Sequence, residues 1–370
     1  MKQPPGYEDP SYPGHVCHLQ RSLYGLKQAP RAWFNRLQEF LTSTGFLASK
    51  TDVPLFYYTT GNSRVYLLVY VDDIIMMGND SALIDTLLGQ LSTAFKIRDL
   101  GTPHFFLGIE NVPSGDGFVL SQCRYMKDIL TRSGMTDCKA LATPAAVTQP
   151  ATPSLTPFEN LTQYRRIVGA LQYLTITRPD LSYSALLKRV LRYIKGTQDY
   201  GLRLSLSASS DLHAYTDSDW AGCPVDRKST SGYAVFLGNN LVSWVSRKQR
   251  TVARSSTEAE YKGLADVSAE VTWVISLLRE LGLHSGSPAT LWCDNLGATY
   301  LAANPVFHAR TKHVEIDYHF VRDKVASGDF IVSFVSTKDQ LAVIFTKPLP
   351  APRYQALRDK LNVVALQPCA

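Results

Sequence analysis

The alternation of hydrophobic and polar positions is clearest around residue 70. Residues 65–71 read Val-Tyr-Leu-Leu-Val-Tyr-Val, and residues 74–78 read Ile-Ile-Met-Met-Gly. These mostly aliphatic runs predict a buried strand and its return in a hairpin. Asp72 and Asp73 lie between the two runs. Two carboxylates at one hairpin tip repel each other, so the pattern indicates either a bound cation or an ordinary polar turn.

A second series of predicted elements begins near residue 206. Four short runs predict strands, at residues 212–217, 232–237, 241–246 and 290–295. Gly-Asn-Asn at 238–240 predicts a hairpin turn. Ser-Thr-Glu-Ala-Glu-Tyr at 256–261 predicts the start of a helix, because a hydroxyl cap and early glutamates favour a helix N-terminus.

Three acids of this series follow strands or lie in the first turns of the helix. They are Asp217, Glu260 and Asp294. Two-metal nuclease sites need carboxylates from separate elements to converge on one pair of ions, and this order of elements allows it. Each acid alone could instead be a helix cap or a solvated surface charge.

A proline-rich segment separates the two series. Residues 142–157 hold four prolines and no charged residue, which predicts a linker. We expect a mixed α/β block at 1–141, the linker at 142–157, a basic helical segment at 158–205, a compact domain at 206–350 and a tail at 351–370.

Positive charge is concentrated in the segment after the linker. Between residues 164 and 196 there are seven basic residues and one acid, Asp180. If residues 181–195 form a helix, three cations share one face and an apolar stripe lies beside it. Such a helix could bind a phosphate backbone, or it could be an ordinary solvated surface helix. The candidate contacts to nucleic acid are Arg189, Arg192 and Lys195.

Length and composition fit a multi-domain protein. The chain has 370 residues, 45% of them hydrophobic, which predicts two or three domains with their own cores. No apolar run reaches the roughly 20 residues of a membrane-spanning helix, and the first residues lack the hydrophobic core of a secretory signal. Six scattered cysteines are expected to be reduced thiols. We therefore expect an intracellular protein, cytoplasmic or nuclear, that is neither secreted nor bound to a membrane.

Four blocks of the first 122 residues occur in the order of known polymerase motifs. Tyr-Val-Asp-Asp at 70–73 resembles the signature of reverse transcriptases. Leu-Tyr-Gly-Leu-Lys-Gln-Ala-Pro-Arg-Ala-Trp at 23–33 resembles the segment that precedes this signature in copia-type long-terminal-repeat retrotransposons. Residues 105–110 and 117–122 are similar to the family's later palm and primer-contacting motifs.

The chain thus resembles the Pol polyprotein of copia-type retrotransposons over nearly its whole length. The resemblance implies that Asp72 and Asp73 are catalytic ligands of Mg²⁺, and that Gln28 faces the nucleotide and template. It also implies a third palm aspartate upstream of the first residue printed here. We therefore expect a 5′-truncated fragment in which this chain alone does not synthesise DNA, unless a partner Pol chain completes the palm.

The C-terminal part resembles the ribonuclease H domain that follows the polymerase in these polyproteins. Residues 215–222, 255–261 and 293–295 match its three motifs. The resemblance implies Asp217, Glu260 and Asp294 as ligands of Mg²⁺ in a two-metal site.

Two further assignments in this domain follow from the resemblance and from the sequence around the helix. Glu260 is preferred to Glu258 as the ligand because the family's ligand glutamate precedes an aromatic or aliphatic residue, and Glu258 would then serve the helix N-terminus. A short basic run, Arg247, Lys248, Arg250 and Arg254, could contact the DNA strand of an RNA–DNA hybrid, with Arg247 and Lys248 as the candidate contacts, although such a run is usually just a solvated surface.

One departure from the family weakens the expected site. Members usually carry Leu-Ala-Asp-Ile-Phe-Thr-Lys, whose aspartate is the fourth metal ligand, but here Val343 occupies that position. Valine cannot coordinate Mg²⁺, which takes oxygen ligands. Asp339 lies about one helical turn away and is expected to be a cap instead. We expect weak metal affinity and slow cleavage. His308, His313 and His319 are spaced unlike common helical metal ligands and are expected to be surface or hydrogen-bonded histidines.

The sequence therefore predicts an α/β (α+β) fold with a reverse transcriptase palm-like domain, a helical connection or thumb region, and a ribonuclease H-like domain whose mixed sheet is flanked by helices. Three functions remain open. The chain could be a slow magnesium-dependent ribonuclease, a nucleic-acid-binding remnant without catalysis, or a decayed product without a selected role.

Overall fold

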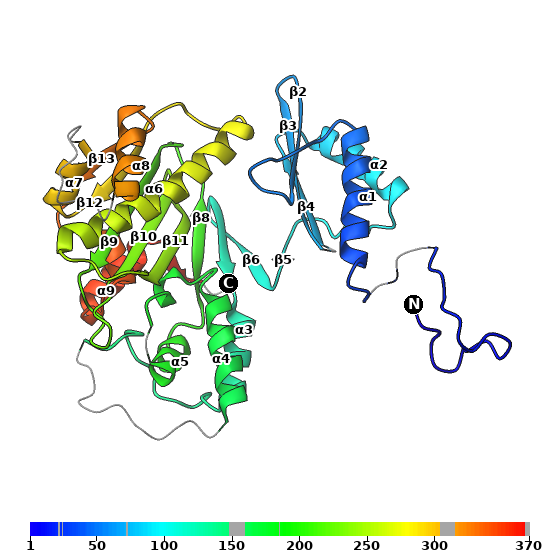
Figure 1. The fold of residues 1–370 in the computed structure, drawn as a ribbon, viewed down its shortest axis with the longest axis horizontal. Coiled ribbons are helices and arrows are strands. Elements are labelled where there is room, and N and C mark those ends of the chain that lie inside the picture. Colours follow the sequence, from blue (N-terminus) through cyan, green and yellow to red (C-terminus); the bar gives the residue numbers. More distant parts are fainter. Residues whose placement is uncertain are drawn as a thin grey trace. The chain divides into compact units, whose positions relative to one another are not determined.

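The computed structural model describes residues 1–20, 23, 25–71, 73–147, 160–184, 186–303 and 315–366. Over these residues the chain divides into two compact units, Met1–Gly101 and Thr102–Ala370. Each unit contains both helices and strands (Figure 1).

The N-terminal unit is an antiparallel sheet covered on one face by two helices. Its strands lie in the order β1-β2-β3-β4. The elements are α1 (Ala29–Ser43), β1 (Leu47–Ala48), β2 (Leu55–Thr60), β3 (Ser63–Tyr70), β4 (Asp73–Gly78) and α2 (Ser81–Ala94). Because side chains alternate along a strand, Val65, Leu67 and Val69 all face the helices and are buried with them.

The hairpin predicted around residue 70 is confirmed. Tyr70 of β3 pairs with Asp73 of β4, and the two strands stay in register as far as Val65 and Gly78. Val71, in the connection, has a φ of +54°, which is the left-handed region. Asp72 lies outside the described residues.

The first sheet of the C-terminal unit joins segments that are far apart in the sequence. Its strand order is β14-β8-β7-β6-β5. The strands are β5 (Phe105–Phe106), β6 (Ile109–Ser114), β7 (Gly117–Ser121), β8 (Tyr200–Ser205) and β14 (Val363–Ala365). Gly117 pairs with Ser205, and Leu202 pairs with Val363. Residues before and after the predicted linker therefore share one sheet.

Helices accompany this sheet and share one hydrophobic core with it. They are α3 (Cys123–Arg132), α4 (Leu161–Leu174), the 3-10 turn η1 (Pro179–Leu181) and α5 (Leu187–Lys195). Met126, Ile167 and Ile194, one from each α-helix, are buried together. The helix expected at 181–195 is thus shorter, since α5 begins only at Leu187.

The second sheet of this unit is mixed and has the order β11-β10-β9-β12-β13. Its strands are β9 (Leu212–Asp219), β10 (Thr230–Leu237), β11 (Asn240–Lys248), β12 (Ala289–Cys293) and β13 (Phe330–Phe334). The first three are antiparallel, whereas β12 runs parallel to both β9 and β13. All four strands that the sequence predicted here are confirmed.

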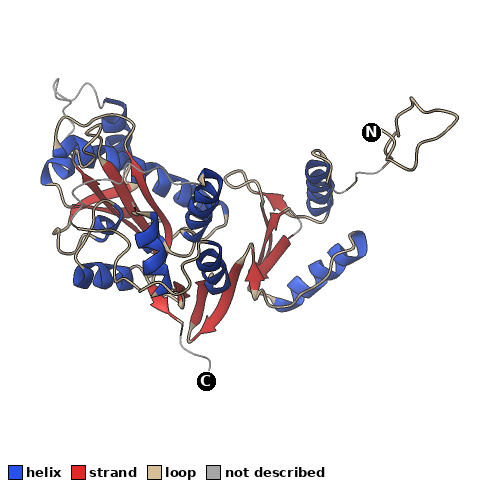
Figure 2. Cartoon of the chain, turned by 90° about the horizontal axis from the view of Figure 1, so that it is seen from below, coloured by secondary structure: helices blue, strands red, loops and turns tan. Residues whose placement is uncertain are grey.

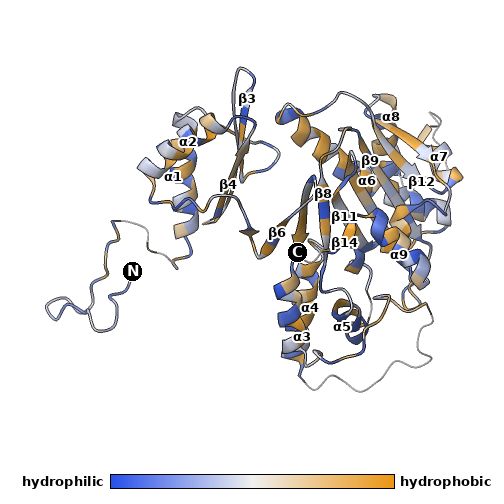
Figure 3. Cartoon of the chain, turned by 180° about the vertical axis from the view of Figure 1, so that it is seen from behind, coloured by the Kyte–Doolittle hydropathy of each residue, from blue (hydrophilic) through white to orange (hydrophobic). Residues whose placement is uncertain are grey.

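Both faces of the mixed sheet are covered by helices (Figure 2). The helices are α6 (Ser256–Glu280), α7 (Leu296–Ala303), α8 (Glu315–Ala326), the 3-10 turn η3 (Leu341–Phe345) and α9 (Ala351–Lys360). Tyr233 and Val235 of β10 pack in the core with α6, and Ala234 and Phe236 pack in the core with η3. Many residues within α6 and within the strands of this sheet are hydrophobic (Figure 3). The predicted α/β class, with a mixed sheet flanked by helices, is confirmed.

Some expected boundaries fall inside compact structure. The units divide after Gly101, so residues 102–141 pack with the C-terminal unit. Thr143 and Ala145, at the start of the expected linker, are buried. The expected tail contains α9 and β14, in which Tyr354 and Val363 are buried. These segments pack because they carry apolar side chains spaced to face one core.

The described part of the chain holds no helix long and apolar enough to cross a membrane. Five cysteines in this part of the chain form no disulfide: Cys17, Cys123, Cys138, Cys223 and Cys293.

Candidate metal centre

Three carboxylates from separate elements meet in the C-terminal unit. Asp217 lies near the end of β9, Glu260 lies in the second turn of α6, and Asp294 directly follows β12. One oxygen of each lies within 4.8 Å of the others. The parallel pairing of Thr216 with Cys293 brings the two strand ends together and so places both aspartates at one edge of the sheet.

The start of α6 separates the roles of its two glutamates. Ser255 Oγ accepts a hydrogen bond from the Glu258 N–H (3.2 Å), which caps the helix. The Glu258 carboxylate accepts the Arg254 N–H (2.8 Å) and pairs with Lys262 (2.6 Å). Glu258 therefore serves the helix N-terminus. Glu260, about 200° further round the helix, points to the other acids.

A glycine lets α6 approach β9 closely enough for this arrangement. A Cβ atom at Gly263 would lie 2.8 Å from Ser218 Oγ and 3.0 Å from Thr216 Oγ1. A side chain at this position would have to displace these hydroxyl groups or the helix itself.

The cluster is buried and carries more negative charge than its surroundings compensate. Asp217 is 1% exposed and Glu260 is 7% exposed. Burial, followed by repulsion from Asp217 and Asp294, raises the pKa of Glu260 to about 9. Burial also raises the pKa of Asp217 above its usual range, although Lys347 and Thr346 oppose the shift. Glu260 Oε2 and Asp294 Oδ1 are buried and accept no hydrogen bond among the described residues.

These residues fit a divalent cation. Three carboxylates offer the hard oxygen ligands that Mg²⁺ prefers. The two buried oxygens without hydrogen-bond donors could be satisfied by such an ion, and a bound cation would also offset the repulsion among the three acids.

Three residues not predicted from the sequence hold the aspartates in place. Thr346 Oγ1 donates a hydrogen bond to Asp217 Oδ2, and Lys347 Nζ lies 3.4 Å from Asp217 Oδ1. Thr337 Oγ1 donates to Asp294 Oδ2 (3.0 Å). Thr346 and Lys347 belong to the same seven-residue motif as Val343, so a signal for them was present, but nothing local marks Thr337.

Val343 contributes no oxygen from its side chain to the cluster. It is 1% exposed and lies in the apolar core that contains η3. Gln340 caps this turn, because its side chain accepts the Ala342 N–H (3.2 Å). The expectation that Asp339 is the cap was wrong, since its carboxylate accepts the Ser336 hydroxyl instead (2.9 Å).

The residues predicted for the palm are not gathered into a comparable site. Asp73 is exposed at the start of β4, and Asp72 lies outside the described residues. Gln28 is exposed before α1, and its side chain makes no capping hydrogen bond. Asp73 belongs to no acidic cluster within the described part of the chain.

Several predicted nucleic-acid contacts are already engaged within the protein. Arg189 donates to Thr143 Oγ1 (2.7 Å), and Arg192 donates to the Lys139 carbonyl (2.7 Å). Lys195 is partly buried in the last turn of α5. The Arg189 contact ties the start of the expected linker to α5, and the Arg192 contact ties residue 139, just before it.

The basic run after β11 is similarly engaged. Arg247 pairs with Asp266, and Lys248 lies 2.8 Å from Asp226. Each of these side chains therefore already has an acidic partner, and their contact with a hybrid stays a prediction. Of the three histidines, His308 and His313 lie outside the described residues, and the ring of His319 contacts Tyr318.

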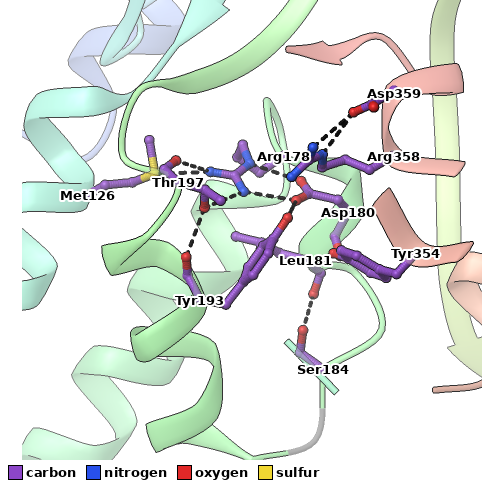
Figure 4. A network of polar contacts seen from close by, with 10 residues as sticks. All are labelled: Met126, Arg178, Asp180, Leu181, Ser184, Tyr193, Thr197, Tyr354, Arg358 and Asp359. Carbon is purple, nitrogen blue, oxygen red and sulfur yellow. Dashed lines mark hydrogen bonds and ion pairs between the residues drawn. The ribbon is translucent and has the colours of Figure 1, made fainter. Parts of the chain in front are cut away.

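Arg178, counted above with the basic segment, is fully buried (Figure 4). Its guanidinium makes two hydrogen bonds to Asp180 (2.9 and 2.8 Å) and one to the Thr197 carbonyl (2.8 Å). Tyr193 also donates to Asp180 (2.7 Å), and Tyr354 of α9 donates to the Asp180 carbonyl (2.7 Å). This network is structural and is closed to a ligand.

Comparison with known proteins identifies the family. The family model described as reverse transcriptase (RNA-dependent DNA polymerase) matches residues 1–147. The retrovirus-related Pol polyprotein from transposon RE2 of Arabidopsis thaliana is 47% identical over 100% of this chain. The chain belongs to the copia-type retrotransposon Pol polyproteins. It spans 26% of the length of the RE2 polyprotein.

Two further proteins are similar to this member of the family. A transposon Ty5-1 protein of Saccharomyces cerevisiae is 30% identical over 73% of this chain and 94% of its own length. Among solved structures, LC11-RNase H1 in complex with an RNA/DNA hybrid covers 37% of this chain and 94% of that chain, with 11% identity and a TM-score of 0.28.

Proposed function

We propose that the C-terminal unit cleaves the RNA strand of RNA–DNA hybrids slowly, with Asp217, Glu260 and Asp294 as ligands of Mg²⁺. The observation that carries this proposal is the convergence of three carboxylates within 4.8 Å, with two buried oxygens that accept no hydrogen bond among the described residues. Membership in a Pol family with a reverse transcriptase region supports a hybrid as the substrate.

The residues of this chain hold and orient the cluster. Thr346 and Lys347 fix Asp217, Thr337 fixes Asp294, and the capped start of α6 fixes Glu260. Divalent cations in nucleases activate water for attack and stabilise the leaving oxygen. Because water is largely excluded from Asp217 and Glu260, the attraction between their carboxylates and a cation is stronger than it would be in water.

The expected rate is low because Val343 replaces the family's fourth carboxylate. A site with fewer anionic oxygens binds a divalent cation more weakly. This same observation favours a second candidate function, in which the chain binds nucleic acid without cleaving it.

A hybrid-cleavage assay separates the two candidates. The purified chain, with Mg²⁺, should cut the RNA strand of a labelled hybrid, and Asp217→Asn should abolish the cutting. A single-stranded RNA of the same sequence controls for contaminating ribonucleases. Equal cleavage by the parent chain and by Asp217→Asn would overturn the catalytic proposal.

A further inference from the structure

Two loops lie side by side next to the acid cluster. The first loop, residues 220–229, leaves β9 directly after its acids, and the second, residues 249–255, leads into α6. The Gln249 N–H donates to the Ser229 carbonyl (2.8 Å) and joins the loops. Lys248, at the end of β11, reaches both Asp226 (2.8 Å) and Cys223 Sγ (3.0 Å) in the first loop.

Trp220 presents a fixed aromatic surface on these loops. Its indole N–H donates to the Ala253 carbonyl (3.1 Å), yet 54% of the residue is exposed. The one polar atom of the side chain is therefore satisfied within the protein, and what faces the solvent is ring. An exposed ring held in one orientation is suited to stacking against a base or ribose.

The backbone after Trp220 is held in an unusual conformation. Ala221 has a φ of +56°, a region that residues with a Cβ rarely adopt, and its N–H donates to Ser229 Oγ (3.0 Å). Arg227 in the same loop has a φ of +55°. Strain of this kind persists only where surrounding contacts enforce it, and it is commonest at functional sites.

Unpaired positive charge lies on the same two loops. Arg227, Arg250 and Arg254 are exposed, and none of them makes an ion pair with a described residue. Their neighbours differ, since Arg247, Lys248 and Lys262 are each paired with an acid. The one acid in these two loops, Asp226, is paired with Lys248. The exposed charge that remains on these loops is positive.

This combination fits a nucleic-acid backbone. Three clustered carboxylates repel phosphates, so a polyanion needs compensating cations close to the cluster. Guanidinium groups beside an exposed aromatic ring supply such charge and a stacking surface together. A neutral protein partner would not require the three arginines.

We propose that Trp220, Arg250 and Arg254 form the surface that holds the backbone of an RNA–DNA hybrid beside Asp217, Glu260 and Asp294. The proposal deepens the proposed function and rests on it for the identity of the ligand. Within the predicted basic run, the proposal assigns the substrate contacts to Arg250 and Arg254 rather than to Arg247 and Lys248. Arg250 and Arg254 make no ion pair with a described residue, so phosphate binding breaks none of that kind.

The test measures binding apart from catalysis. Fluorescence anisotropy with a labelled hybrid, in EDTA and over a range of salt concentrations, gives the affinity and its salt dependence. The double variant Arg250→Ala/Arg254→Ala should lower the slope of log K against log salt by about 2. Trp220→Ala should weaken binding about tenfold, whereas Trp220→Phe should keep most of the affinity.

Arg279→Ala is the control, because Arg279 lies near the opposite end of α6, roughly 35 Å along the helix from its start beside Arg254. It should leave the slope unchanged. Thermal melts identify any variant that fails to fold, and the double arginine variant and Trp220→Phe decide the matter if Trp220→Ala unfolds.

The outcomes separate this proposal from the catalytic one. An unchanged slope and affinity in the folded double variant would overturn the proposed surface, even if Asp217→Asn abolishes cleavage. A reduced slope together with no cleavage by the parent chain would overturn the catalytic proposal and leave the surface standing.

Discussion

The three acids differ in how their charge is compensated. Asp217 accepts a hydrogen bond from Thr346 and lies near the ammonium of Lys347, and Asp294 accepts one from Thr337. Glu260 Oε2 has no donor among the described residues. Burial of an uncompensated carboxylate is unfavourable, which is why the pKa of Glu260 is raised to about 9. A bound cation would offset the cost of burying the Glu260 carboxylate.

A substitution at position 343 tests whether the absence of a fourth carboxylate there weakens Mg²⁺ binding. Val343→Asp should bind Mg²⁺ about tenfold more tightly than the parent chain, because a fourth carboxylate joins the cluster. That ratio corresponds to about 1.4 kcal/mol of binding free energy. Isothermal titration calorimetry measures it, and hybrid cleavage should accelerate in parallel.

Val343→Asn is the matched control because it has the same shape as Val343→Asp without the charge. If Val343→Asp binds Mg²⁺ no more tightly than Val343→Asn, position 343 does not face the metal site.

At the scale of elements, a buried ion pair ties η1 to its neighbours. Arg178 and Asp180 are both fully buried, and the hydrogen bonds around them reach α5 through Tyr193 and α9 through Tyr354. Burial alone would raise the pKa of Asp180, but attraction to Arg178 and the hydrogen bonds from Arg178 and Tyr193 leave it below its usual value. The ionised form of Asp180 therefore stabilises the fold.

Asp180→Asn should lower the free energy of unfolding by about 3–5 kcal/mol, because it leaves the Arg178 charge buried without its partner. Since the pKa of Asp180 is lowered in the folded state, its contribution is present above the unfolded value of 3.8 and is lost as pH falls below it. The stability difference between the parent chain and the variant should therefore narrow below about pH 4. Chemical denaturation across pH measures both effects.

Asp116→Asn is the control, since it breaks an exposed pair with Arg203 and should change stability by less than about 1 kcal/mol. If Asp180→Asn is as mild as Asp116→Asn, the buried pair does not stabilise these elements.

The sequence indicated the elements whose signals are local. The hairpin at 65–78 and the strands of the mixed sheet follow from alternation and turn residues, and the capped start of α6 follows from Ser255 and Glu258. The convergence of Asp217, Glu260 and Asp294 followed from their places at the ends of elements.

The sequence did not indicate the strand pairings and contacts that join residues far apart along the chain. The pairing of β7 with β8, and of β8 with β14, has no local signature. The ion pair of Arg247 with Asp266 likewise joins residues 19 positions apart. The support that Thr337 gives to Asp294 joins residues 43 positions apart.

At the scale of the whole molecule, the chain consists of two compact units that divide after Gly101. The C-terminal unit includes β5, β6, β7 and α3, which precede the proline-rich segment. These elements supply three strands of its first sheet and buried residues of its core, such as Met126 and Ile129. A boundary at the proline-rich segment would therefore cut through a folded unit.

Truncation tests this division. A protein of residues 102–370 should unfold cooperatively and bind hybrid, because it keeps both sheets and both of the unit's cores. A protein of residues 142–370 should be unstable or aggregate, since β8 would lose its β7 partner and the core would be exposed. Circular dichroism melts compare the two. Equal melting temperatures would show that residues 102–141 are not part of this unit.

The proposed metal site is tested most directly by Mg²⁺ binding to two variants of α6, Glu260→Gln and Glu258→Gln. Glu260→Gln should weaken Mg²⁺ binding at least tenfold in calorimetry, whereas Glu258→Gln, two residues away and engaged with Lys262, should bind as tightly as the parent chain. Equal affinity for Mg²⁺ in the parent chain and both variants would contradict the existence of a metal site at Asp217, Glu260 and Asp294.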